Sequence, residues 1–293
     1  MPTIRLAHSP DSDDAFMFYA IAAGKIPTGE RRYEHQLQDI ETLNRRALDG
    51  ELDVTAVSIH AYAHIADRYA LLPHGASMGD RYGPRLVGAV PPSGEVRAAL
   101  AGMRVAIPGD LTTAALTLRL FQPEAATVVV RFDEIERAVA AGEVDAGLVI
   151  HEGQLTFSEH GLHLWRDMGE WWFDETGLPL PLGGNVVRRA LGQETIAAVS
   201  CDLKASIEYA LEHRAEALEY AIRYARGLSR DQADRFVSMY VNSYTVDYGA
   251  IGRRAVQLLL DKAYEAGAIP RRVEATFAGD NSRSAEKADS LSG

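Results

Sequence analysis

The chain contains one phrase twice, with the same order of residue types in both copies. Residues 50–63 are GELDVTAVSIHAYA and residues 142–157 are GEVDAGLVIHEGQLTF. Each copy starts with Gly, Glu, an apolar residue and Asp, runs through a short apolar stretch, and ends at a polar break that includes a histidine. We expect a helix to end at each glycine and a strand to begin at each aspartate. Two α/β units of one kind predict two lobes of one kind.

The first two thirds of the chain alternate β-rich runs with helical patterns. In IETLNRRALDG, apolar Ile40, Leu43 and Ala47 recur at helical spacing, and Gly50 is placed to end the helix. Such alternation predicts mostly parallel sheets covered by helices on both faces. The strand candidates are TIRLAHS, YEHQLQD, DVTAVS, RLVGAV, MRVAIP, ATVVVRF, AGLVIH and HLWRDM.

After about Ala190 the pattern becomes helical, with long amphipathic stretches that include SRDQADRFVSMYVNSY after a serine N-cap. We expect lobe 1 to comprise residues 1–88 and 184–278, and lobe 2 residues 89–183. PRLVGAVPPSG and LPLGGNVVRRA are the expected crossings between the lobes, because Pro and Gly permit a hinge. The small and polar residues of 279–293 predict a disordered tail.

Charge and cysteine content exclude several classes of function. The formal net charge is −11, without a basic block, which excludes a nucleic-acid partner but allows a small anionic ligand held by local dipoles. Cys201 is the single cysteine, so the sequence offers neither an internal disulfide nor a cysteine metal cluster. No apolar run approaches the roughly 20 residues of a membrane span, and the start MPTIRLAHSPDSDD has no apolar signal region. We therefore expect a cytoplasmic protein.

Ligands of parallel α/β sheets bind beyond the carboxyl ends of the strands, where loops lead into helices. Four polar segments follow apolar strands in this way: HSPDSDDAF, VSIHAY, IPGDLTTA and VIHEGQLT. In the third, Thr112 and Thr113 begin a helix whose free N–H groups suit a carboxylate, although Thr112 also suits a simple cap. Ser58 has the same two interpretations, as a helix cap or as a donor to a ligand.

Other polar and aromatic residues leave two interpretations each. Residues 11–14 contain three acids, which suit either a magnesium ion or the positive end of a helix. His60 and His64 are four apart on one helix, as a metal pair would be, yet without an evident third ligand they suit packing roles. Trp171 and Trp172 suit either a roof over the cleft or the core of the small lobe.

His151 is the sharpest candidate for chemistry. It falls where an apolar strand ends, and a histidine at a helix N-terminus stays neutral and can accept a proton near neutral pH. A capping or core role is the alternative. As a base, its ring would be oriented by Glu152 or by a backbone carbonyl. The sequence contains no dinucleotide fingerprint, phosphate loop or nucleophile elbow, so hydride transfer, ATP use and esterase chemistry are poorly supported.

Several uncommon phrases occur in an order that resembles the 1,4-dihydroxy-6-naphthoate synthase family of the futalosine route to menaquinone. They are SPDSDDAFMFYAI, DIETLNRRALDGELDVTAVSIHAYA, PGDLTTA, GEVDAGLVIHEGQLTF and TGLPLPLGG, and the resemblance covers about residues 4–277. That family commonly has Pro-Cys-Pro-Asn-Asp wording where this chain has SPDSDD. The departure leaves any ligand role of residues 11–13 open.

The resemblance implies a fold like the type II periplasmic binding proteins, with two α/β lobes and an interlobe cleft. It implies a carbon–carbon lyase that cleaves cyclic dehypoxanthine futalosine, an anionic small molecule, without a metal or another cofactor. By the resemblance, His151 is the proton acceptor. The implied substrate-binding residues are Ala56, Val57, Ser58, Thr113 and Ala114.

Two other functions fit part of the pattern. Chorismate dehydratase of the same pathway shares the fold, but it has Ile-Gly-Asp wording where this chain has Ile150, His151 and Glu152. A non-catalytic solute-binding protein for small carboxylates also has this fold, although such receptors work outside the membrane and the expected signal peptide is missing. The sequence does not set an oligomeric state.

Overall fold

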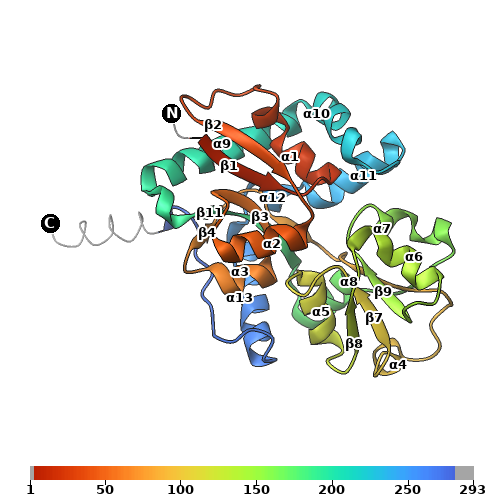
Figure 1. Cartoon of the computed structure of the whole chain (residues 1–293). Coiled ribbons are helices and arrows are strands. Elements are labelled where there is room, and N and C mark those ends of the chain that lie inside the picture. Colours follow the sequence, from red (N-terminus) through yellow and green to blue (C-terminus); the bar gives the residue numbers. More distant parts are fainter. Residues whose placement is uncertain (1–2, 281–293) are drawn as a thin grey trace.

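The structure is a computed structural model that describes residues 3–280, so the predicted tail lies almost wholly outside the described residues. Figure 1 shows two lobes, each built around one sheet. The first sheet has the strand order β2-β1-β3-β11-β4, and β5 pairs with β11. Its strands are β1 (Thr3–His8), β2 (Arg32–Leu37), β3 (Val54–Ser58), β4 (Tyr69–Leu71), β5 (Ser77–Gly79) and β11 (Leu180–Arg188).

The second sheet has the order β10-β6-β9-β7-β8. In each sheet the parallel pairs occupy one side and the antiparallel pairs the other, so that β3 and β9 each have one parallel and one antiparallel neighbour. All eight strands expected from the sequence are present, and the α/β two-lobed fold is confirmed. The strands of the second sheet are β6 (Arg85–Gly88), β7 (Arg104–Ile107), β8 (Ala126–Val129), β9 (Ala146–Val149) and β10 (His163–Asp167).

Helices cover both sheets, and the long helices of the last third pack on the first one. α1, α9, α10 and α11 pack together on one face of that sheet, whereas α3 and α13 lie against β11 on the other (Figure 1). The helices are α1 (Ser12–Ala22), α2 (Ile40–Asp49), α3 (Ile59–Ile65), α4 (Val96–Ala99), α5 (Thr113–Phe121), α6 (Ile135–Ala140), α7 (Gly153–Thr156), α8 (Met168–Thr176), α9 (Gln193–Glu212), α10 (Arg214–Ala221), α11 (Arg230–Tyr240), α12 (Ser243–Val246) and α13 (Gly249–Glu265). Among these described helices, none has the length and apolar character needed to cross a bilayer.

The repeated sequence forms the same local structure in both lobes. A helix ends before each copy, at a glycine that adopts the left-handed conformation, as at Gly50 with φ 71°. The carboxylate of Asp53 then accepts the backbone N–H of Arg5 at 3.0 Å, across the parallel pair β1–β3. Asp145 accepts the backbone N–H of Arg104 at 2.7 Å in the corresponding pair β7–β9. Each aspartate therefore fixes the start of one strand against its neighbour.

The chain crosses between the two lobes at positions that differ from the two predicted ones. PRLVGAVPPSG contains β6, which pairs with β9 and β10, and LPLGGNVVRRA contains β11, which pairs with β3, β4 and β5. The chain instead passes from the first sheet to the second at residues 80–84 and returns between β10 and β11. Pro181 and Gly183 resemble hinge residues in sequence, but they flank an irregularity within a strand. The lobe boundaries at residues 88 and 184 remain predictions.

Candidate active site

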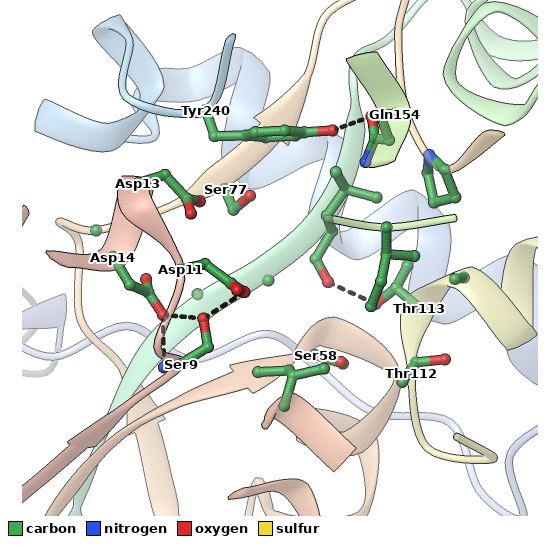
Figure 2. A pocket seen from close by; sticks show the side chains of 18 of the residues that line it. Ser9, Asp11, Asp13, Asp14, Ser58, Ser77, Thr112, Thr113, Gln154 and Tyr240 are labelled. Carbon is green, nitrogen blue, oxygen red and sulfur yellow. Dashed lines mark hydrogen bonds between the residues drawn. The ribbon is translucent and has the colours of Figure 1, made fainter. Parts of the chain in front are cut away.

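A cavity lies between the two lobes, and its walls come from both of them. It is lined by the β1–α1 connection, the end of β3, the first half of β11, and α11, and from the second lobe by the start of α5 and the β9–α7 connection (Figure 2). The four segments picked out by the strand-end rule contribute Ser9, Ser58, Thr113 and Gln154 to its lining. The geometric rule for α/β sheets therefore located the cavity.

The start of α5 presents hydrogen-bond donors to this cavity. Thr112 is its N-cap, where the hydroxyl accepts the N–H of Ala115 at 3.2 Å and donates to the carbonyl of Gly109 at 2.8 Å. Thr113 and Ala114 both line the cavity and occupy the first turn, where backbone N–H groups lack a helical carbonyl partner. The positive end of the helix and these N–H groups suit an anionic group of a ligand.

Ser58 lies at the end of β3 and also lines the cavity. It is the N-cap residue of α3, but its hydroxyl makes no capping hydrogen bond. The side-chain amide of Asn44 donates to that hydroxyl at 3.1 Å, while its carbonyl accepts the Ser58 N–H at 2.9 Å. The hydroxyl hydrogen therefore remains for a ligand. Ala56 and Val57 are buried in β3, and neither is part of the cavity lining.

His151 lies beside the cavity with its ring engaged elsewhere. Its Nε2 donates to the carbonyl of Phe132 at 3.0 Å, and its Nδ1 accepts the N–H of Gly153 at 2.9 Å. Ile150 and Gln154 line the cavity, but His151 does not. A backbone carbonyl therefore holds the ring, and a backbone carbonyl was one of the two groups expected to orient it. In this conformation neither nitrogen is available to a ligand in the cavity, and the role of His151 as a base stays a prediction.

Glu152 joins the two lobes at the edge of the cavity. Its Oε1 accepts the N–H of Ser12 at 3.3 Å and the Ser12 hydroxyl at 3.2 Å, and its Oε2 accepts Arg226 at 2.9 Å. Arg226 also contacts Asp11 and lies 4.7 Å above the Phe132 ring. Arg226 holds a left-handed backbone conformation with φ 47°, which is uncommon for a residue with a side chain. We call these contacts the Glu152 clamp.

Three acids at the start of α1 line the same cavity, Asp11 as the N-cap residue and Asp13 and Asp14 in the first turn. Asp14 accepts the N–H of Ser9 at 2.8 Å and the Ser9 hydroxyl at 2.9 Å, yet burial raises the pKa of Asp14 to about 6. Burial, followed by the charges of its neighbours, raises the pKa of Asp13 well above its ordinary value. Within residues 3–280 no group of three or more His, Cys, Asp or Glu side chains is arranged to hold a metal ion.

Aromatic and amide side chains form another wall of the cavity. Tyr240 of α11 donates its hydroxyl to the side-chain carbonyl of Gln154 at 2.7 Å, across the lobes. Phe236, one turn earlier on α11, and Met17 of α1 complete an apolar wall. Apolar walls and a few polar groups at fixed points are typical of sites for planar organic ligands.

The remaining candidates have structural roles. His60 is buried, its Nδ1 lies 3.3 Å from the Thr112 carbonyl, and burial lowers its pKa to about 4. His64 packs against it at a ring distance of 5.7 Å. Trp172 is fully buried in the core of the first lobe and Trp171 packs at the edge of that core, so neither roofs the cavity. The histidines agree with the packing alternative, whereas Trp172 belongs to the core of the first lobe and not to that of the small lobe.

Sequence reasoning missed Asn44 and Tyr240, and it included Gln154 only as part of the segment VIHEGQLT. A signal for Asn44 was present, because it shares the apolar stripe of α2 with Leu43 and Ala47, and its exposed fraction is 0%. A polar side chain on such a stripe must find a buried partner, which here is Ser58. Tyr240 has no corresponding signal, since an aromatic residue on the inner face of an amphipathic helix looks like core.

The family model for menaquinone biosynthesis matches residues 4–265. The chain belongs to the menaquinone biosynthesis family. Two curated relatives, both named 1,4-dihydroxy-6-naphtoate synthase, come from Thermus thermophilus and Streptomyces coelicolor. The first is 42% identical over 91% of this chain and 96% of the relative, and the second is 37% identical over 92% and 95%. The resemblance found in the sequence is thereby confirmed for the family.

Solved structures agree on the fold. A crystal structure of a protein from Archaeoglobus fulgidus is 46% identical, covers 91% of this chain and 98% of its own, and superposes with a TM-score of 0.87. The alkanesulfonate-binding protein of Xanthomonas axonopodis pv. citri, solved with MOPS bound, is 15% identical with a TM-score of 0.66, over 93% and 96% of the two chains. This second likeness shows the periplasmic-binding-protein fold alone.

Proposed function

We propose that the protein acts as a 1,4-dihydroxy-6-naphthoate synthase, a carbon–carbon lyase that cleaves cyclic dehypoxanthine futalosine in menaquinone biosynthesis. The observation that carries the proposal is the interlobe cavity with the open first turn of α5 on one side, in a chain whose curated relatives bear that name. The cytoplasmic location expected from the sequence stays a prediction.

In the proposed complex, the substrate carboxylate binds at the start of α5. The N–H groups of Thr113 and Ala114 donate to it, and the hydroxyl of Ser58 adds a third donor. The planar part of the substrate lies along the wall formed by Phe236 and Tyr240. Binding at both ends orients the scissile bond and keeps water away from it.

In the proposed reaction, a base removes a proton from the sugar-derived hydroxyl, the carbon–carbon bond breaks, and its electron pair moves into the fused ring. The ring becomes aromatic, which supplies the driving force. His151 is the proposed base. For this role the imidazole must leave the Phe132 carbonyl and the Gly153 N–H and turn into the adjacent cavity, next to Ile150 and Gln154. Substrate binding supplies the free energy for that rearrangement.

The two rival functions have less support. Neither curated relative is named a chorismate dehydratase. The sulfonate-binding proteins share the fold, but at 15% identity they carry no argument about function. Incubation with cyclic dehypoxanthine futalosine separates an enzyme from a binder. We expect the substrate to disappear and dihydroxynaphthoate to accumulate, as followed by chromatography and mass spectrometry, whereas a binding protein would return the substrate intact.

Replacement of His151 tests the proposed base. In His151→Asn the side-chain carbonyl can still accept the Gly153 N–H, so the fold should be retained. We expect kcat to fall by about 10²–10⁴-fold, as for loss of a general base. Exposed His163 on β10 provides the matched control, because His163→Asn should leave kcat unchanged. Near-normal turnover by folded His151→Asn would remove this residue from the mechanism.

A further inference from the structure

The cavity is electrically asymmetric from one side to the other. The positive end of α5 lies on one side, and the carboxyl groups of Asp11, Asp13 and Asp14 lie on the other, as Figure 2 shows. A ligand carboxylate is stabilised at the helix end and repelled by the acids. The part of an anionic ligand farthest from its carboxylate must therefore face the acids.

Asp13 differs from the other two acids in its partners. Asp14 is held by the N–H and hydroxyl of Ser9, and Asp11 pairs with Arg226. For Asp13, no Lys, Arg or His nitrogen forms an ion pair anywhere in the described part of the chain. Figure 2 shows its carboxyl group pointing away from α1 and into the cavity. Among residues 3–280, Asp13 therefore presents a carboxyl group that is not paired with a cation.

The surroundings of this carboxyl group favour its protonated form. Burial raises the pKa of Asp13 most, and the negative charges of Asp14, Asp11 and Glu152 raise it further, against a smaller opposing effect of the Asp14 N–H. Tyr240 faces it from α11, and its pKa is raised as well, so its hydroxyl stays neutral. Every titratable group named here opposes a charge on Asp13.

We infer that Asp13 is the proton donor of the proposed reaction, an inference that rests on the proposed function. As the base takes the proton of the sugar-derived hydroxyl, the carbon–carbon bond breaks and the sugar fragment leaves as a carbonyl compound. The released electron pair reaches a ring carbonyl oxygen, which takes the proton of the Asp13 carboxyl group and becomes a hydroxyl. The proton on the base later restores Asp13, so the step is balanced without an oxidant or reductant.

The geometry places the donor at the correct end of the substrate. The two oxygens of the product ring lie on the ring that does not bear the carboxylate. When the carboxylate binds at α5, those oxygens point toward α1 and Asp13. His151 belongs to the same side, since its neighbour Glu152 contacts Ser12 of α1. Once the imidazole of His151 turns into the cavity, as proposed above, acid and base lie at the same end of the ligand, where the bond breaks.

The test compares Asp13→Asn with wild type on cyclic dehypoxanthine futalosine. The amide has the same shape but donates no proton, so we expect kcat to fall by about 10²–10⁴-fold while KM changes by less than about threefold. Asp13→Glu should recover part of the loss. Asp67→Asn, on an exposed residue after α3, should behave as wild type.

Two further readouts separate proton donation from a structural role. The kcat of wild type should fall as pH rises through the pKa of Asp13, and the residual activity of Asp13→Asn should lack this fall. The infrared band of protonated carboxyl groups should be weaker in Asp13→Asn than in wild type at the same pH, because burial raises the pKa of Asp13 well above its ordinary value. If wild type turns over the substrate and Asp13→Asn is within about threefold of it, this inference alone fails. If wild type does not turn it over, the proposed function fails and this inference falls with it.

Discussion

At the scale of single residues, burial of the acids at the start of α1 lowers the stability of the folded chain. Asp14 has an exposed fraction of 8%, and burial outweighs its two bonds from Ser9, so that its pKa is raised to about 6. An acid whose pKa is higher in the folded chain binds its proton more tightly there. Above the ordinary pKa of a carboxyl group, the folded state is therefore penalised for each such acid.

Asp14 makes a prediction about pH and stability. Between about pH 4 and pH 6 the folded chain carries more protons than the unfolded chain, so the free energy of unfolding falls as pH rises through this window. Asp14→Asn removes this contribution, and its Oδ1 can still accept the Ser9 N–H. We expect its stability loss between pH 4 and pH 7 to be smaller than that of wild type by roughly 1–3 kcal/mol. Urea unfolding of both proteins at the two pH values gives these free energies. An equal loss of stability in wild type and Asp14→Asn would contradict the prediction.

At the scale of elements, the repeated phrase marks where strands begin. Both aspartates accept an N–H from the neighbouring parallel strand, but their surroundings differ. Asp53 pairs with Arg5 and Arg188, and its side chain is 7% exposed. Although burial opposes the charge, these partners lower the pKa of Asp53. Asp145 is 45% exposed, and its nearest ion pair, with Arg104, is 3.8 Å long. The two equivalent aspartates therefore contribute unequally to the stability of the fold.

We predict unequal effects of replacing the two aspartates. Asp53→Ala leaves two guanidinium groups without their carboxylate and should lower the free energy of unfolding by about 1–3 kcal/mol, since both arginines are partly exposed. Asp145→Ala should cost less than about 1 kcal/mol. Thermal and urea unfolding of both variants measure the two losses of stability. Equal losses would show that the backbone hydrogen bond, which both share, dominates.

Sequence patterns predicted the elements whose periodicity is strong, and missed those set by tertiary pairing. β4 and β5 have three residues each and too few positions to show alternation. β11 contains Pro181, Gly183 and Gly184, which resemble a loop, but partners on both sides hold it extended. The glycine is needed at 184, because a Cβ there would lie 2.1 Å from the Tyr248 hydroxyl. Contacts between distant segments carry no local signal.

The residues of the site also divide into those with a local sequence signal and those that depend on contacts between distant segments. The positions of Ser58 and Thr113 in the cavity lining were predictable, because the strand-end rule and helix-start chemistry act locally, whereas Ala114 was named through the resemblance. The direction of the His151 ring was not, since it depends on the carbonyl of Phe132, nineteen residues away. The resemblance to a family supplied its role, whereas only the fold shows where the ring points.

At the scale of the whole molecule, polar contacts across the cleft hold the lobes together. Glu152 is 2% exposed and binds Ser12 and Arg226 of the first lobe, and Gln154 accepts the hydroxyl of Tyr240. A buried carboxylate that loses its cation is costly, because the charge remains without compensation. The Glu152 clamp therefore favours the closed arrangement of the lobes.

Arg226→Ala tests this role of the Glu152 clamp. Without the guanidinium, Glu152 and Asp11 repel each other, and the edges of the two lobes should separate. We expect small-angle scattering of the ligand-free variant to give a larger radius of gyration than wild type. Arg272→Ala, an exposed arginine whose nearest ion pair is 4.0 Å long, is the control. An unchanged radius in folded Arg226→Ala would show that other contacts suffice for closure.

The hydroxyl of Thr113 donates to the carbonyl of Leu182 at 2.6 Å, which ties the start of α5 to β11 in the opposite lobe. α5 also packs against α3 and α13 of that lobe. The proposed anion-binding end of the cavity is therefore tied to both lobes, and it should move least if one lobe rocks against the other. If the lobes close around a substrate, its carboxylate at the start of α5 should stay in place while the rim that carries His151 moves toward it.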